Sequence, residues 1–298
     1  MRDGRLHKAK KIRIIRIKDG YFFVLKERTI MGYHSKKFED LTLRDDFIFG
    51  NVMKNKALCK ELLEIILEVK IRDITYPEEQ KTIKIIRDAR SIRLDVYVED
   101  DQNTVYNVEM QTTNPGNLPK RTRYYQGLID LNLISKGEDY DNLKKSYVIF
   151  ICVEDIFGQG RYIYTFENIC LQDFNLRLGD DSTKIFLNAD GYVEDISPEL
   201  KAFLVYLRDG VISNTFTKNL EDAVEAGKNC DEWRREYMTL QMRDRENYRK
   251  GRKEGQTETT INNIKNMMKN LGCSIDKAMD VLEIPAESRG FYKKNIGL

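Results

Sequence analysis

Hydrophobic and polar residues alternate in two segments near the middle of the chain, RLDVYV (93–98) and YNVEMQ (106–111). Alternation with a period of two predicts β-strands in which one face is apolar. The other face holds Asp95 in the first strand, and Glu109 and Gln111 in the second. If the turn lies midway between the two segments, they form a hairpin in which Asp95 lies opposite Glu109.

The same kind of pattern predicts the elements around this hairpin. Thr42 is expected to cap a short helix, and apolar residues at helical spacing predict a stronger one over 56–69. The expected elements that follow are strands at 83–89, 91–100 and 104–111, a helix over 121–134, an entirely apolar strand at 146–153, irregular strands at 161–166 and 184–191, and a helix over 198–207. This order predicts an α/β sandwich with a mixed central sheet and helices on both faces.

The two ends of the chain have a different character. Residues 1–35 form a basic extension in which 12–26 resemble a hairpin around an Asp-Gly turn; a later start of translation at Met31 is the alternative. The central domain is expected over 36–220, and a helical region over 221–298. That region begins with a mixed-charge helix, and the short helices after it suit either self-association or a helix-turn-helix, although Gly290 would interrupt its recognition helix.

Composition narrows the possible chemistry. The chain has 298 residues, five cysteines that lack metal-motif spacing, and only two histidines, so any acid–base or metal chemistry must rest on carboxylates. Residues 1–37 carry a charge of +9, which leaves −7 on the rest of a chain whose total is +2. No apolar run suits a signal peptide or a membrane span, so we expect a cytoplasmic protein that does not contact a membrane.

The acidic face of the hairpin is the strongest chemical signal. Two carboxylates opposite one another repel, and a hard divalent cation placed between them removes this penalty. Asp95 and Glu109 are therefore candidate Mg²⁺ ligands, with Gln111 two residues along on the same face. The alternative is an ordinary exposed strand in which Arg93 neutralises Asp95.

The spacing of these residues resembles the PD-(D/E)XK nuclease superfamily: Asp95, thirteen intervening residues, then Glu109-x-Gln111. Four segments in order resemble, more closely, the recombination-promoting nucleases, also described as PD-(D/E)XK nuclease-family putative transposases. The segments are LRDDFIFGNVM, RLDVYVEDDQNTVYNVEMQ, LPKRTRYYQGLIDLNLISKGEDYDNLKKSYVIFIC and FGQGRYIYTF, within residues 38–210.

The resemblance implies a restriction-endonuclease-like αβββαβ core and DNA cleavage that depends on Mg²⁺ or a similar cation such as Mn²⁺. It links the chain to DNA recombination or mobile elements, with Asp95 and Glu109 as metal ligands. It also implies that Asp46, or less well Asp45, completes the metal site from the first helix. A plain helix-dipole role is the alternative for these two acids.

The chain departs from the superfamily pattern at two positions. Leu94 stands where a proline is usual, and Gln111 stands where a lysine is usual. Glutamine carries no charge at neutral pH and can only form hydrogen bonds, so Lys120 or Arg121 becomes the candidate for the missing charge. A nuclease fold that has lost turnover and binds DNA is therefore the rival hypothesis.

The segment KRTRYYQ offers groups that suit DNA. Lys120, Arg121, Arg123 and Tyr125 are predicted to contact phosphates or bases, because arginine binds phosphate and aromatic rings stack on bases. Packing of one or both tyrosines, Tyr124 and Tyr125, on the sheet is the alternative. A homodimer would supply the two active sites that cleavage of both strands requires, but the sequence leaves the oligomeric state open.

Overall fold

The computed structural model describes residues 12–16, 22–26, 36–76, 95–135 and 137–297. The chain divides into two compact units, one formed by residues 36–237 and the other by residues 1–35 with 238–298. The first unit contains the predicted α/β domain. The boundary expected at residue 220 falls inside a helix, α5 (Thr215–Lys228), that the sequence pattern did not indicate.

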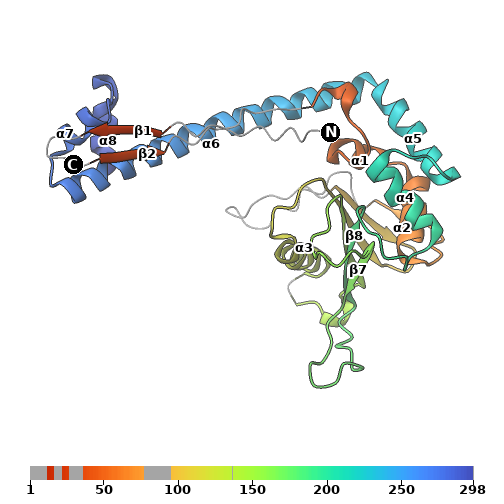
Figure 1. Cartoon of the computed structure of the whole chain (residues 1–298). Helices are drawn as coiled ribbons and strands as arrows, with labels where there is room; N and C mark the ends of the chain where they lie inside the picture. The colour runs from red at the N-terminus through yellow and green to blue at the C-terminus, as the bar shows by residue number, and fades with distance from the viewer. Residues whose placement is uncertain (1–11, 17–21, 27–35, 77–94, 136, 298) are drawn as a thin grey trace. The chain divides into compact units, whose positions relative to one another are not determined.

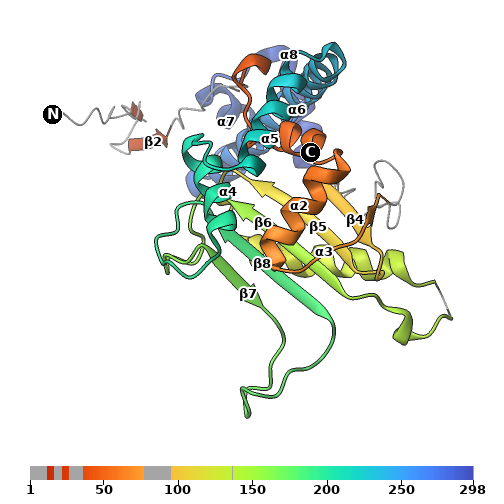
Figure 2. The same ribbon diagram turned by 90° about the vertical axis from the view of Figure 1, so that its right-hand side faces the viewer.

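A six-stranded mixed sheet forms the centre of the first unit (Figures 1 and 2). Its strands, in spatial order, are β3 (Ile74–Thr75), β4 (Val96–Asp100), β5 (Val105–Gln111), β6 (Ser146–Cys152), β8 (Ser182–Asn188) and β7 (Ile163–Phe166). Strands β5, β6 and β8 run parallel, and the other neighbouring pairs are antiparallel. The expected mixed sheet is confirmed, whereas the strand predicted at 83–89 lies outside the described residues.

Helices cover both faces of this sheet. Helix α3 (Leu118–Leu133) lies on one face, and the other carries α1 (Asp46–Val52), α2 (Lys56–Leu67), α4 (Pro198–Asp209) and α5 (Figures 1 and 2). Short 3-10 turns occupy Phe38–Asp40 and Tyr140–Asn142. Helix α1 begins at Asp46 rather than after Thr42, because the Asp45 carboxylate accepts the Thr42 amide at 2.9 Å and closes a turn before the helix.

The hairpin of β4 and β5 has the predicted register. Val96 pairs with Val108 and Tyr97 with Asn107, as a turn midway between the segments requires. Strand β5 is buried along nearly its whole length, however, so the expected half-exposed strand is wrong. Its polar face lies under α3, and Glu109, the charged residue on that face, is therefore buried.

The second unit contains the chain's two ends. Strands β1 (Ile12–Arg16) and β2 (Phe22–Lys26) pair antiparallel, which confirms the predicted hairpin; its turn lies outside the described residues. Helix α6 (Asp231–Leu271) is continuous for 41 residues, so the predicted mixed-charge helix is confirmed and includes the first of the short helices expected after it.

Two short helices follow α6: α7 (Ile275–Val281) and α8 (Ala286–Ile296). They pack on the end of α6 around a small core of Ile264, Met267, Ala278, Met279 and Ile284. Helix α8 runs through Gly290 without a break, contrary to the prediction. Among the described residues, no helix is long and apolar enough to cross a membrane.

Candidate active site

Asp95 and Glu109 lie together where the pairing of β4 and β5 ends. The Asp95 amide donates to Glu109 Oε1 at 3.3 Å, and the Met110 amide donates to Asp95 Oδ2 at 3.0 Å. Each carboxylate is therefore held by the backbone of the opposite strand. The structure brings together the two acids that the sequence placed opposite one another, with Glu109 inside β5 and Asp95 directly before the first residue of β4.

Glu109 is almost completely buried, with 2% of its surface exposed. Burial first, and then the negative charge of Asp95, raise the pKa of Glu109 to about 8. The Asn107 amide lies 3.2 Å from Glu109 Oε1 and 3.2 Å from the Val96 carbonyl oxygen, and it donates to both when its nitrogen faces them. The carboxylate is thus held in place while its charged form stays unfavourable.

Arg121, on the first turn of α3, brings a cation to this pair of acids. Its Nη1 donates to Gln111 Oε1 at 2.9 Å and its Nη2 to the Tyr125 hydroxyl at 2.6 Å, while Nη2 lies 3.9 Å from Glu109 Oε2. The guanidinium carbon also lies 5.4 Å from the ring centres of both Tyr125 and Phe150. Three neighbours, Gln111, Tyr125 and Phe150, therefore fix the guanidinium beside Glu109.

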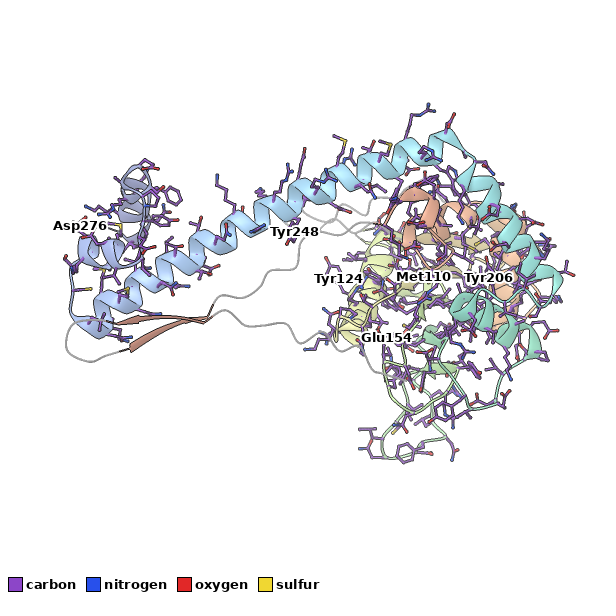
Figure 3. The ribbon with its side chains drawn as sticks, turned by 45° about the horizontal axis from the view of Figure 1, so that its top comes forward. Met110, Tyr124, Glu154, Tyr206, Tyr248 and Asp276 are labelled. Carbon is purple, nitrogen blue, oxygen red and sulfur yellow. The ribbon has the colours of Figure 1, made fainter. Side chains whose placement is uncertain are left out.

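Tyr125 has a different place from the one predicted. Only 4% of it is exposed, and its ring stacks on Phe150 with centres 5.8 Å apart. It is therefore not placed to stack on a base, because its ring is part of the core. Tyr124, labelled in Figure 3, is 43% exposed and lies with Lys120 and Arg123 on the outer side of α3. Residues three and four apart share a helix face, so these three form one exposed stripe.

Asp46 is the first residue of α1, and its carboxylate accepts the Phe47 amide at 2.7 Å. One turn further on, a Cβ added to Gly50 would lie 3.4 Å from the Asp95 carbonyl oxygen. The face of α1 that carries Asp46 therefore passes the Asp95 backbone. Within the described ranges, no three acidic, cysteine or histidine side chains are close enough to hold a metal, so Asp46 does not join Asp95 and Glu109 in this structure.

A model of one protein family matches residues 44–254 of the chain, and its description is PD-(D/E)XK nuclease family transposase. The chain belongs to this family. No curated protein and no solved structure matches it.

Membership of the PD-(D/E)XK family agrees with the fold, a mixed sheet flanked by helices with a helical region at the C-terminal end. The match begins just before α1 and includes β4, β5 and α3, so every residue of the candidate site lies within it. The assignment of Asp95, Glu109 and Gln111 to the family's motif positions remains a prediction.

Two parts of the site had no role predicted from the sequence. Asn107 shares the Glu109 face of β5 by simple alternation, and that signal was sufficient to find it. No sequence pattern of this kind indicated the role of the segment after β6. Asp155 accepts the amides of Phe157 at 3.0 Å and Gly160 at 2.7 Å, and this turn places the Phe157 ring 5.2 Å from that of Phe186. Phe186 stacks on Phe150 at 5.7 Å, so the loop joins the aromatic core under Arg121.

Proposed function

We propose that this member of the family is a divalent-metal-dependent endonuclease that hydrolyses DNA phosphodiester bonds in recombination or in the movement of mobile elements. The observation that carries the proposal is the pair formed by the buried Glu109 and the half-buried Asp95, held by reciprocal backbone hydrogen bonds with Arg121 beside it. A buried carboxylate with a second acid beside it is unfavourable for the metal-free fold, and such arrangements are typical of functional sites.

The donor set fits Mg²⁺ or Mn²⁺. Asp95 and Glu109 would hold the ion, because hard cations prefer carboxylate oxygens, and Mg²⁺ commonly uses one or two carboxylates with water and substrate phosphate completing its shell. When bound, the ion would supply positive charge and an activated water for attack on phosphorus. The raised pKa of Glu109 supports this assignment, since a cation favours the charged form that burial opposes.

Arg121 would perform the electrostatic role that a lysine has in most of the superfamily. Its guanidinium is always charged and presents several donors, and the bonds to Gln111 and Tyr125 hold it in one orientation. A preorganised cation of this kind stabilises the charge that develops on a phosphate during hydrolysis. Gln111 then acts as a positioning residue, which accounts for a glutamine at this place.

The DNA would approach over the exposed stripe of α3. Lys120 and Arg123 are exposed, among the described residues neither forms an ion pair, and Tyr124 shares their side of the helix. Lysine and arginine contact phosphates, and an exposed tyrosine ring offers a stacking surface. Asp46 would turn from its own helix toward the ion, since the face of α1 that carries it already passes Asp95.

A catalytically inactive DNA-binding protein is the second candidate. The observation in its favour is that Gln111 occupies the lysine position and that Arg121 is already engaged with Gln111 and Tyr125. The two candidates agree on DNA binding and differ only in turnover.

Supercoiled plasmid with Mg²⁺ separates them. The endonuclease hypothesis predicts that the wild type nicks the plasmid and that Asp95→Asn and Glu109→Gln each abolish nicking. The control is Glu99→Gln, which changes an acid of β4 that is paired with Lys144 at 2.6 Å, and this variant should retain nicking. DNA binding by all four proteins with nicking by none would establish the inactive module. Nicking that survives in both site variants would show that the chemistry lies elsewhere.

A further inference from the structure

The long helix α6 has one basic side. Residues 243–254, around Tyr248 (labelled in Figure 3), include nine charged residues. At about 3.6 residues per turn, Arg245, Arg249, Arg252 and Lys253 fall on one stripe of the helix, with Asp244 and Glu254 directed to other sides and Glu246 at its border. We refer to these four residues as the basic stripe. A helix that is merely solvated would distribute both signs around its circumference.

The cations of the basic stripe lack local partners. All four are exposed, and among the described residues none of them forms an ion pair. Arg245, Arg252 and Lys253 have no acid three or four residues away in either direction, whereas Glu246 lies three residues before Arg249. Arg245, Arg249 and Lys253 follow one another at intervals of four, a spacing at which like charges repel and weaken a helix. The helix therefore keeps a repulsion that an anionic ligand would relieve.

The opposite side of the same segment provides the contrast. Arg243 and Lys250 lie there, and Glu246 is three residues from the first and four from the second, with Glu254 a further turn beyond Lys250. On that side cations and acids alternate, as expected for a surface that faces only water. The segregation of charge is thus a property of one side and not of the helix composition as a whole.

We propose that the basic stripe of α6 binds the phosphates of a DNA duplex, as a contact additional to the one at Asp95 and Glu109. The proposal rests on the proposed function for the identity of the polymer. Arg245 to Lys253 extend about 12 Å along the helix axis, enough to contact successive phosphates of one backbone. An anionic membrane fits less well, because over residues 238–256 this side offers only Met238, Met242 and the half-buried Tyr248, with no leucine, isoleucine or phenylalanine to insert among lipids.

The basic stripe has a charge-matched test in the full-length chain. Arg245→Gln with Lys253→Gln removes one arginine and one lysine from the stripe, and Arg243→Gln with Lys250→Gln removes the same charges from the other side. Duplex binding is measured by fluorescence anisotropy between 50 and 200 mM salt, in a Glu109→Gln background so that no cleavage intervenes.

Loss of two phosphate contacts should lower the slope of log affinity against log salt by about 1.8, so a fourfold rise in salt should weaken the stripe variant about 12-fold less than its parent. The other-side variant should keep the parental slope. Equal slopes in the two double variants would overturn the proposal. It would also be overturned if the parent and the other-side variant bind phosphatidylserine vesicles and the stripe variant does not.

Cleavage is scored separately from this slope, in the Glu109 form of each double variant. A reduced slope without nicking by any protein would leave the stripe proposal standing and remove the endonuclease. Nicking with unchanged slopes would leave the endonuclease proposal standing and remove the stripe proposal. Failure of the parent to bind duplex DNA would remove both.

Discussion

The buried carboxyl group of Glu109, with Asp95 beside it, predicts that the metal-free protein loses stability as the pH rises. Burial and the charge of Asp95 raise the pKa of Glu109 in the folded chain to about 8, against an ordinary value of 4.5. Between these values the folded state keeps a proton that the unfolded state releases, so the contribution of Glu109 is complete below about pH 4.5 and is lost as the pH rises through about 8. At 1.36 kcal/mol per pH unit the loss is of the order of 4–5 kcal/mol.

Glu109→Gln should remove this dependence, because glutamine has a similar shape and no charge to bury. At pH 5 the variant should match the wild type within about 1 kcal/mol. At pH 8.5 it should be more stable by several kcal/mol, which for a unit of this size raises the melting temperature by roughly 2–4 °C per kcal/mol. Mg²⁺ should then stabilise the wild type at pH 8.5 and leave the variant unchanged.

The measurement is thermal or urea unfolding in EDTA from pH 5 to 8.5, repeated with Mg²⁺. Glu99→Gln is the control, since that side chain lies on β4 but is paired with Lys144. Parallel stability profiles for wild type and Glu109→Gln would refute the argument that Glu109 is held in an unfavourable charged form. A Mg²⁺ effect of equal size in both proteins would show that the ion binds elsewhere.

Three further predictions concern the surroundings of the acids. Arg121→Ala should lower nicking 10²–10³-fold with DNA affinity largely kept, and Arg121→Lys should recover only part of it because lysine lacks the planar fork; single-turnover rates decide this. Tyr124→Ala should weaken binding of single-stranded DNA by about 1–3 kcal/mol, measured by fluorescence anisotropy. Tyr125→Ala should instead lower the free energy of unfolding by about 3–5 kcal/mol, measured by urea titration. Gly227→Ala places a Cβ 1.9 Å from the Trp233 ring and should cost about 1–3 kcal/mol, which the fluorescence of this single tryptophan can follow through unfolding.

The sequence was sufficient for the hairpin because its signals are local. A period of two fixed the faces of β4 and β5, and a symmetric turn fixed the register that places Asp95 opposite Glu109. The burial of those faces is a different matter. Whether α3 covers the polar side of β5 depends on how that helix packs on the sheet, which alternation along a strand does not report.

The tyrosines of α3 show the same limit. Tyr124 and Tyr125 are neighbours with the same side chain, and a small rotation of the helix decides which one enters the core. The sequence pattern also did not predict that α6 is one continuous helix, because its polar middle part has no periodic apolar residues to connect Asp231 with Leu271. Local patterns identified these helices but not their orientation or full length.

The aromatic rings beneath Arg121 have a consequence for how the family can vary. The guanidinium contacts Tyr125 and Phe150, Phe150 stacks on Phe186, and Phe186 meets Phe157 edge-on at 88°. These rings come from a helix, two strands and a loop, yet the placement of one cation depends on all of them. A smaller residue at any ring would leave a gap that its neighbours must fill, so we expect these four positions to change together during evolution while the acids beside them stay the same.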